Sequence, residues 1–157
     1  MAKFRFQLDA VEKIRVQKEQ KMLEELAASQ RNYQQKIAEK KVLLSKKQDS
    51  FVRKNELLSR DASINDIRLL EEYISGLKQQ IMRADQAIIR SRRFVDQDMR
   101  KYINARKERM MIDRLKEKAL EEFKQEQSRL DQKKLDDLIT MRARLNHGPI
   151  DGEEEIA

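Results

Sequence analysis

The clearest pattern in the chain is a set of bulky apolar residues that recur every seven positions in its second half. They are Ile67, Ile74, Ile81, Ile88, Val95 and Tyr102. A companion row three residues later consists of Leu70, Leu77, Ala84, Ala105 and Ile112, with Ser91 and Asp98 as gaps. Two rows at this spacing form a narrow apolar stripe, the a and d positions of a coiled coil. The pattern predicts a long helix whose stripe lies against another helix.

The first half of the chain carries a weaker pattern with the same period. Its apolar row is Val16, Leu23, Ile37, Leu44, Phe51 and Leu58, with Gln30 in the one gap. The companion row is small or polar, and consists of Ala27, Gln34, Lys41, Gln48 and Asn55. A polar residue at a core position lowers stability but can fix register and partner. We therefore expect a thin contact between two helices rather than a thick bundle.

A short break separates the two patterns. Ser63 followed by Asp66 fits a helix N-cap with an acid in the first turn. We expect an all-α fold in which residues 1–145 form one coiled-coil hairpin, with helices at about 8–58 and 64–145 and a turn at about 59–63. A short connection between long helices favours an antiparallel hairpin. The alternative is one continuous helix with a stutter, paired in parallel with a second copy.

The second helix is longer than the first, so its end should overhang. Folding back at the turn places Leu8 beside roughly Asp113, and residues beyond about Leu115 then lack a neighbouring helix. Over residues 121–137 the apolar residues are Phe123, Leu130 and Leu135. Such a segment must be stabilised by charge pairs along the helix or by a partner. Residues 146–157, which contain four acids, are expected to be a disordered acidic tail.

Composition excludes most catalytic chemistry. Charged residues make up 40% of the chain and aromatic residues 5%, a balance that is also typical of disorder, but the seven-residue register argues against disorder. The chain has no Cys and a single His, and it contains none of the phosphate-binding, hydrolase or metal-binding motifs. We expect no enzyme activity, no cofactor and no metal. The start lacks an apolar signal region and no span is apolar enough for a membrane, so we expect a cytoplasmic protein.

The formal net charge is +7. A basic cluster lies in the middle of the second helix and comprises Arg90, Arg92, Arg93, Arg100, Lys101, Arg106, Lys107 and Arg109. Such a cluster can follow a phosphate backbone. However, acids are interleaved with the cations along the chain, and long cationic side chains also cover the edges of an apolar stripe. We interpret the charges as a solvated helix surface and expect no nucleic acid partner.

Two ends of the sequence resemble one family. Phe4, Phe6, Leu8, Val11 and Arg15 follow the pattern F-x-F-x-L-x-x-V-x-x-x-R, which is similar to the opening of flagellar FliJ proteins. Residues 114–118, 121–123 and 131–138 resemble the closing pattern of the same family. Length and layout agree over nearly the whole chain, while the specific motifs lie at its two ends.

The resemblance implies a role in the flagellar type III export apparatus. Members of this family are antiparallel coiled coils, similar to the central stalk of rotary ATP synthases. They associate with the hexameric export ATPase and promote its assembly and activity. They also contact the cytoplasmic domain of the export gate membrane protein, and some bind export chaperones. We therefore expect a cytoplasmic protein at the inner-membrane face of the flagellar base, held there through protein partners only.

Candidate contact residues follow from the layout of the hairpin. The open end, where the two motif-bearing segments meet, is the expected ATPase contact: Phe4, Phe6, Leu8, Val11, Arg15, Leu115, Phe123, Leu130, Leu135 and Leu138. The expected gate contact is the region around two tyrosines beside the stripe: Tyr33, Ile37, Tyr73 and Leu77. The alternative function is a structural homodimeric coiled coil. Mass in solution separates the two, because we expect the hairpin to be a monomer.

Overall fold

The computed structural model describes residues 3–148 and contains two helices. The first, α1, is Asp9–Ser59, and the second, α2, is Ile64–Asn146. No strand occurs within the described residues. The all-α class, the turn and the greater length of α2 are confirmed, and each helix boundary lies within one residue of its predicted position. Most of the predicted acidic tail lies outside the described residues.

The chain divides into two compact units. Unit 2 is Lys13–Arg109, which holds most of α1, the turn and the first part of α2. Unit 1 consists of Met1–Glu12 and Met110–Ala157, of which the structure describes residues 3–12 and 110–148. Each unit is described by itself below.

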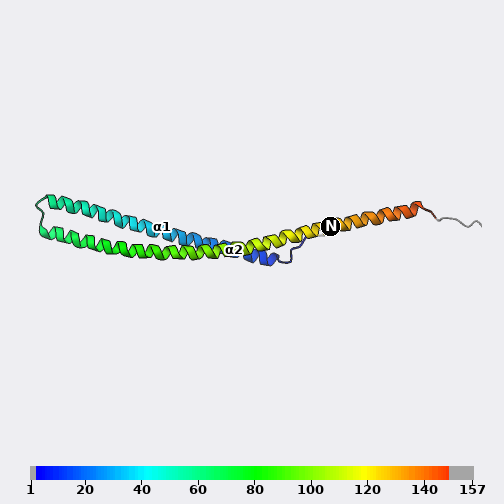
Figure 1. The fold of residues 1–157 in the computed structure, drawn as a ribbon, viewed down its shortest axis with the longest axis horizontal. Helices are drawn as coiled ribbons and strands as arrows, with labels where there is room; N and C mark the ends of the chain where they lie inside the picture. The colour runs from blue at the N-terminus through cyan, green and yellow to red at the C-terminus, as the bar shows by residue number, and fades with distance from the viewer. Residues whose placement is uncertain (1–2, 149–157) are drawn as a thin grey trace, which may run out of the picture. The chain divides into compact units, whose positions relative to one another are not determined.

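Unit 2 is an antiparallel helical hairpin. Figure 1 shows its two helices side by side, joined at the turn after Ser59. Lys54 Nζ lies 2.8 Å from a Glu71 carboxylate oxygen near the turn, and Lys40 Nζ lies 2.5 Å from an Asp85 oxygen farther from it. The alternative prediction of one continuous helix is therefore wrong. Ser63 directly precedes α2, and its carbonyl accepts the Ile67 amide at 3.3 Å, as the carbonyl of an N-cap residue does.

The apolar stripe of α2 is the core of unit 2. Ile74, Leu77 and Ala105 are 4%, 3% and 1% exposed. The two gaps in the stripe are also turned inward. Ser91 is 3% exposed and its hydroxyl donates to the Ile88 carbonyl at 2.9 Å, whereas Asp98 accepts a hydrogen bond from the Ser29 hydroxyl of α1. The predicted register of α2 is therefore correct at its apolar and at its polar positions.

The predicted contact row of α1 is wrong. Val16, Leu23, Leu44 and Leu58 are 46%, 41%, 43% and 58% exposed, and only Ile37 and Phe51 of that row are half-buried. The residues that face α2 belong to two other rows. They include the buried Leu26 and Ser50, and also Glu19, Ser29, Lys40 and Lys54, each of which bonds to a side chain of α2.

Charge pairing contributes to this rotation of α1. The four acids of α2 that reach toward α1 are Glu71, Asp85, Asp98 and Glu108, and each accepts a polar contact from an α1 side chain. Turning the apolar row of α1 inward would leave these partly covered carboxylates without partners. Asp98 is the most covered of the four, with a side chain that is 15% exposed, and a covered carboxylate without a partner is unfavourable. The inward rows of α1 also carry the buried Leu26 and the half-buried Leu43 and Leu57. The polar contacts and these apolar residues together set which side of α1 faces α2.

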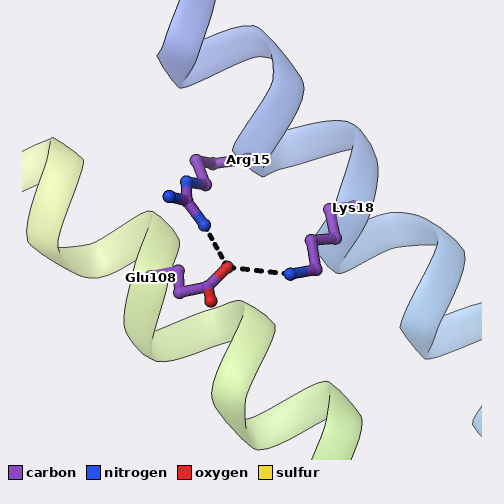
Figure 2. A network of polar contacts seen from close by, with 3 residues as sticks. All are labelled: Arg15, Lys18 and Glu108. Carbon is purple, nitrogen blue, oxygen red and sulfur yellow. Dashed lines mark hydrogen bonds and ion pairs between the residues drawn. The ribbon is translucent and has the colours of Figure 1, made fainter.

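One polar network lies near the end of unit 2 away from the turn. Figure 2 shows Arg15 and Lys18 of α1 converging on the same carboxylate oxygen of Glu108 in α2. Arg15 forms an ion pair with Glu108, and Lys18 Nζ lies 3.1 Å from the shared oxygen. The hydrogen bonds from Lys18 and Arg15 lower the pKa of Glu108 from its ordinary value of 4.5, although partial loss of water acts in the opposite direction.

The lowered pKa of Glu108 makes part of the stability of unit 2 dependent on pH. Because the folded pKa is below the unfolded one, this contribution is complete above about pH 4.5 and is lost as pH falls through the folded pKa. We expect Glu108→Gln to lower the melting temperature near neutral pH, and the gap to the wild type to shrink below pH 4.5. Circular dichroism melting from pH 7 to pH 3 measures this. A gap that stays constant over the range would contradict the assignment.

Candidate partner-binding surfaces

In unit 1 the N-terminal segment, residues 3–8, packs on α2. The rings of Phe4 and Phe123 lie 5.5 Å apart between centroids with an interplanar angle of 57°. This tilted arrangement is one that aromatic pairs favour. The Lys116 ammonium lies 5.9 Å from the centre of the Phe6 ring, within the range of a cation–π contact. The two motif-bearing ends of the sequence are thus neighbours, as the hairpin predicts.

Lys116 also fixes the start of α1. Its ammonium donates to both carboxylate oxygens of Glu12, at 2.7 and 3.0 Å. This hydrogen bond raises the pKa of Lys116, with smaller contributions from the charges of Glu12, Asp9 and Asp113 and against partial loss of water. Lys116 therefore stays charged at neutral pH. It holds the first turn of α1 and the Phe6 ring against the same part of α2.

A shallow groove lies between the N-terminal segment and α2. Its lining includes Phe4, Phe6, Leu8, Leu115 and Phe123. Leu8 and Leu115 are 38% and 49% exposed, while Phe4, Phe6, Val11 and Phe123 are half-buried. The predicted contact residues at this end therefore pack partly on one another. A partner that binds these residues would contact a preformed apolar surface rather than separate side chains.

The C-terminal segment of α2, residues 128–146, has no buried or half-buried position. Leu130, Leu135 and Leu138 are 45%, 59% and 63% exposed. The structure adds three apolar residues that sequence reasoning did not select as contacts, Ile139, Met141 and Leu145, which are 66%, 63% and 80% exposed. Leu135, Leu138, Ile139, Met141 and Leu145 fall within one helical face, because three- and four-residue steps keep side chains on one side. The same three- and four-residue spacing, read from the sequence, could have identified Ile139, Met141 and Leu145 as contact candidates.

Arg15 differs from the other ATPase-contact candidates because it belongs to unit 2. Its guanidinium already bonds to Glu108 across the hairpin. Its side chain is 36% exposed, so its evident role is to connect α1 and α2. The sequence could not show this pairing, because the two residues are 93 positions apart.

The gate-contact candidates do not form one cluster. Tyr33 lines a groove with Ala27, Gln30, Gln34 and Val95, and the half-buried Ile37 follows it one turn later. Tyr73 is 51% exposed and lines a different groove with Asp49, Leu57 and Leu69. Leu77 is 3% exposed and belongs to the contact between the helices. Of the four residues, Leu77 is the one that a partner cannot reach while the hairpin is closed.

Within residues 3–148 no group of three or more His, Cys, Asp or Glu side chains is arranged to hold a metal ion. No described helix has a stretch that combines the length and the hydropathy required to cross a membrane.

Comparison with known proteins gives one result. A family model described as Flagellar FliJ protein matches residues 4–148. Neither the curated proteins nor the solved structures contain a match to the chain. The matched residues include both segments whose sequence resembles the family, residues 4–15 and residues 114–138.

The Phe4–Phe123 contact predicts a measurable coupling within unit 1. Aromatic pairs of this geometry contribute about 0.5–1.5 kcal/mol beyond their buried area. We expect Phe4→Ala or Phe123→Ala to raise amide exchange in residues 9–12 a few-fold, and the double variant to add little more. Phe94→Ala, at a 59% exposed position in unit 2, is the control and should change nothing there. Fully additive effects of the two replacements would show that the rings do not hold each other.

Proposed function

Because the chain belongs to the FliJ family and so is a component of the flagellar export apparatus, we propose that it acts there without catalysing a reaction. In this proposal it binds the hexameric export ATPase as a central stalk, promotes its activity, and links it to the cytoplasmic domain of the export gate. Export chaperones are further proposed partners. Its place would be the cytoplasmic side of the inner membrane at the flagellar base.

The single observation that best supports ATPase binding is the exposed apolar face on the C-terminal segment of α2. Leu135, Leu138 and Leu145 are 59%, 63% and 80% exposed on a helix with no packing neighbour among the described residues. A helix with few apolar residues and no packing is marginal in water. A ring of subunits around this segment would bury these side chains and stabilise the helix.

A second contact is proposed on unit 2. Tyr33 lines a groove between α1 and α2, Ile37 follows it one helical turn later, and both are half-buried. Tyrosine is enriched at protein interfaces because its ring offers apolar area and its hydroxyl a hydrogen bond. We assign the gate contact to this groove rather than to the groove beside Tyr73.

The alternative, a structural homodimeric coiled coil, is favoured by the same exposed face of α2. Two copies of the C-terminal segment could bury this face against each other. Sedimentation equilibrium distinguishes the possibilities, because the proposed stalk is a monomer in the absence of its partners and the structural coiled coil is a dimer.

A pair of variants tests the two proposed contacts separately. Leu135→Asp with Leu138→Asp should weaken binding to the export ATPase at least about tenfold, because two apolar side chains lose their burial. The same variant should bind the gate domain like the wild type. Tyr33→Ala should show the opposite pattern. Biosensor titrations against each purified partner supply the measurements.

The control is Val42→Asp with Leu69→Asp, at positions that are 54% and 65% exposed in unit 2. It introduces the same two charges away from both proposed contacts. Helix content is checked by circular dichroism for every variant. If the Leu135→Asp, Leu138→Asp variant keeps its helicity and binds the export ATPase with wild-type affinity, the proposed ATPase contact is wrong.

A further inference from the structure

The two long sides of the hairpin in unit 2 differ in chemistry. On one side, Lys78 of α2 lies 5.8 Å from the Phe51 ring of α1, and Lys40 pairs with Asp85. On the other side, Lys18 pairs with Glu108. The row of α1 that contains Lys18 is polar throughout, with Glu25, Asn32, Glu39, Lys46 and Arg53 at seven-residue steps. The row that contains Phe51 is the apolar row that the structure leaves largely exposed.

Two rows of α1 face α2, and the row that contains Phe51 is a third row beside them. Apolar residues in such a third row are unusual for a two-helix hairpin. In a two-stranded coiled coil the rows beside the core are typically charged. A helix with apolar residues at three rows per heptad is instead typical of a bundle with at least three helices. The side that carries Phe51 therefore has the apolar pattern of a surface that packs against a further helix.

The exposed apolar side chains on this side come from both helices. Ser29 of α1 bonds to Asp98 and Glu19 bonds to Arg109, so this register places Leu23 level with Ile103. Leu23, Ile103 and Met99 are 41%, 40% and 38% exposed. Between the helices a groove is lined by Ala27, Gln30 and Val95. We call this surface the apolar side: Val16, Leu23 and Ala27 of α1 with Ile89, Met99 and Ile103 of α2.

The charges around the apolar side are mostly cations without partners. Arg92 and Arg106 lie on one flank of Ile89 and Ile103 along α2, and Arg93, Arg100 and Lys107 lie on the other. All five are exposed, and within residues 3–148 none of them has an ion pair or a side-chain hydrogen bond. The acid in this stretch that remains exposed is Asp96. The acids nearer the turn on the same side, Asp85 and Glu71, are already paired with α1.

This excess of cations decides between possible occupants. A second copy would bring the same arginines to the interface, and like charges placed together are unfavourable. An acidic partner would neutralise them. The apolar rows run parallel to the hairpin axis over residues 89–107 of α2, a length of about 27 Å at the helical rise. An amphipathic helix of about five turns matches this length and buries such rows in a groove.

We propose that the apolar side of unit 2 binds an amphipathic helix whose apolar stripe is flanked by Asp and Glu. Leu23, Met99 and Ile103 form the floor of this site, and Arg92, Arg106, Arg93, Arg100 and Lys107 pair with the acids. The site adjoins the groove assigned to the gate contact, which Ala27 and Val95 also line. The residues replaced in its test, Leu23, Arg92, Ile103 and Arg106, are not among those assigned to the ATPase or gate contacts, so its failure and that of the proposed function can be told apart.

Fluorescence anisotropy with two synthetic helical peptides tests this site on the full chain. Both peptides carry the same Leu stripe, one flanked by Glu and the other by Lys. We expect the Glu peptide to bind and the Lys peptide to bind at least about tenfold more weakly. Raising NaCl from about 50 mM to about 300 mM should weaken the Glu peptide, because salt screens exposed charge pairs.

Variants locate the binding. Arg92→Glu with Arg106→Glu, and separately Leu23→Gln with Ile103→Gln, should each weaken the Glu peptide about tenfold or more. The matched control, Lys46→Glu with Arg53→Glu, makes the same charge change on the other side and should leave the affinity within about twofold. Equal binding of both peptides, or equal effects of the charge variants and the control, would overturn the proposal. It would also be overturned by a dimer in sedimentation equilibrium that Leu23→Gln with Ile103→Gln abolishes, since a second copy would then cover the apolar side.

Discussion

The hairpin depends on the pairing of polar side chains across α1 and α2. At its inward positions α1 mixes apolar and polar residues: Leu26 is buried, and Met22, Leu43 and Leu57 are half-buried. The remaining inward positions include Glu19, Ser29, Lys40 and Lys54, each bonded to a side chain of α2. The apolar stripe of α2 supplies burial, and these contacts, together with the apolar residues of α1 that face inward, decide which face of α1 meets it. Polar contacts at core positions contribute register more than stability.

This constraint has a consequence for the surface of unit 2. Because the rows of α1 that carry these polar residues face inward, the predicted apolar row lies to one side, where Leu23 and Leu44 are 41% and 43% exposed. The same contacts occupy Glu71, Asp85, Asp98 and Glu108 of α2. Within residues 3–148, Arg92, Arg93, Arg100 and Arg106 are left without an ion pair. An apolar, cationic side follows directly from how the hairpin closes. Unit 1 has a different surface, in which the Phe4–Phe123 contact and the exposed face around Leu138 carry the apolar area.

The sequence was sufficient for α2 and insufficient for the rotation of α1. The spacing of Ile74, Ile81 and the companion Leu77 leaves one way to form a stripe, so the helix and its buried face could be predicted. In α1 the apolar row that contains Leu23 competed with two rows that mix apolar and polar residues, and the outcome depended in part on Asp85 and Glu71, which are distant in the sequence. Likewise, the FliJ-like ends pointed to Phe4 and Phe123 as neighbours, whereas the pairing of Arg15 with Glu108 became visible only when the helices were placed together.

The central claim, that the chain serves the export ATPase as a stalk, is tested most directly by ATP hydrolysis. The export ATPase of the same flagellar system is titrated with the full chain, and the rate is followed as a function of the molar ratio. The account predicts stimulation that saturates well below one chain per ATPase subunit, because one stalk serves a whole ring. An unchanged rate at every ratio, with no co-migration of the two proteins on a sizing column, would contradict it.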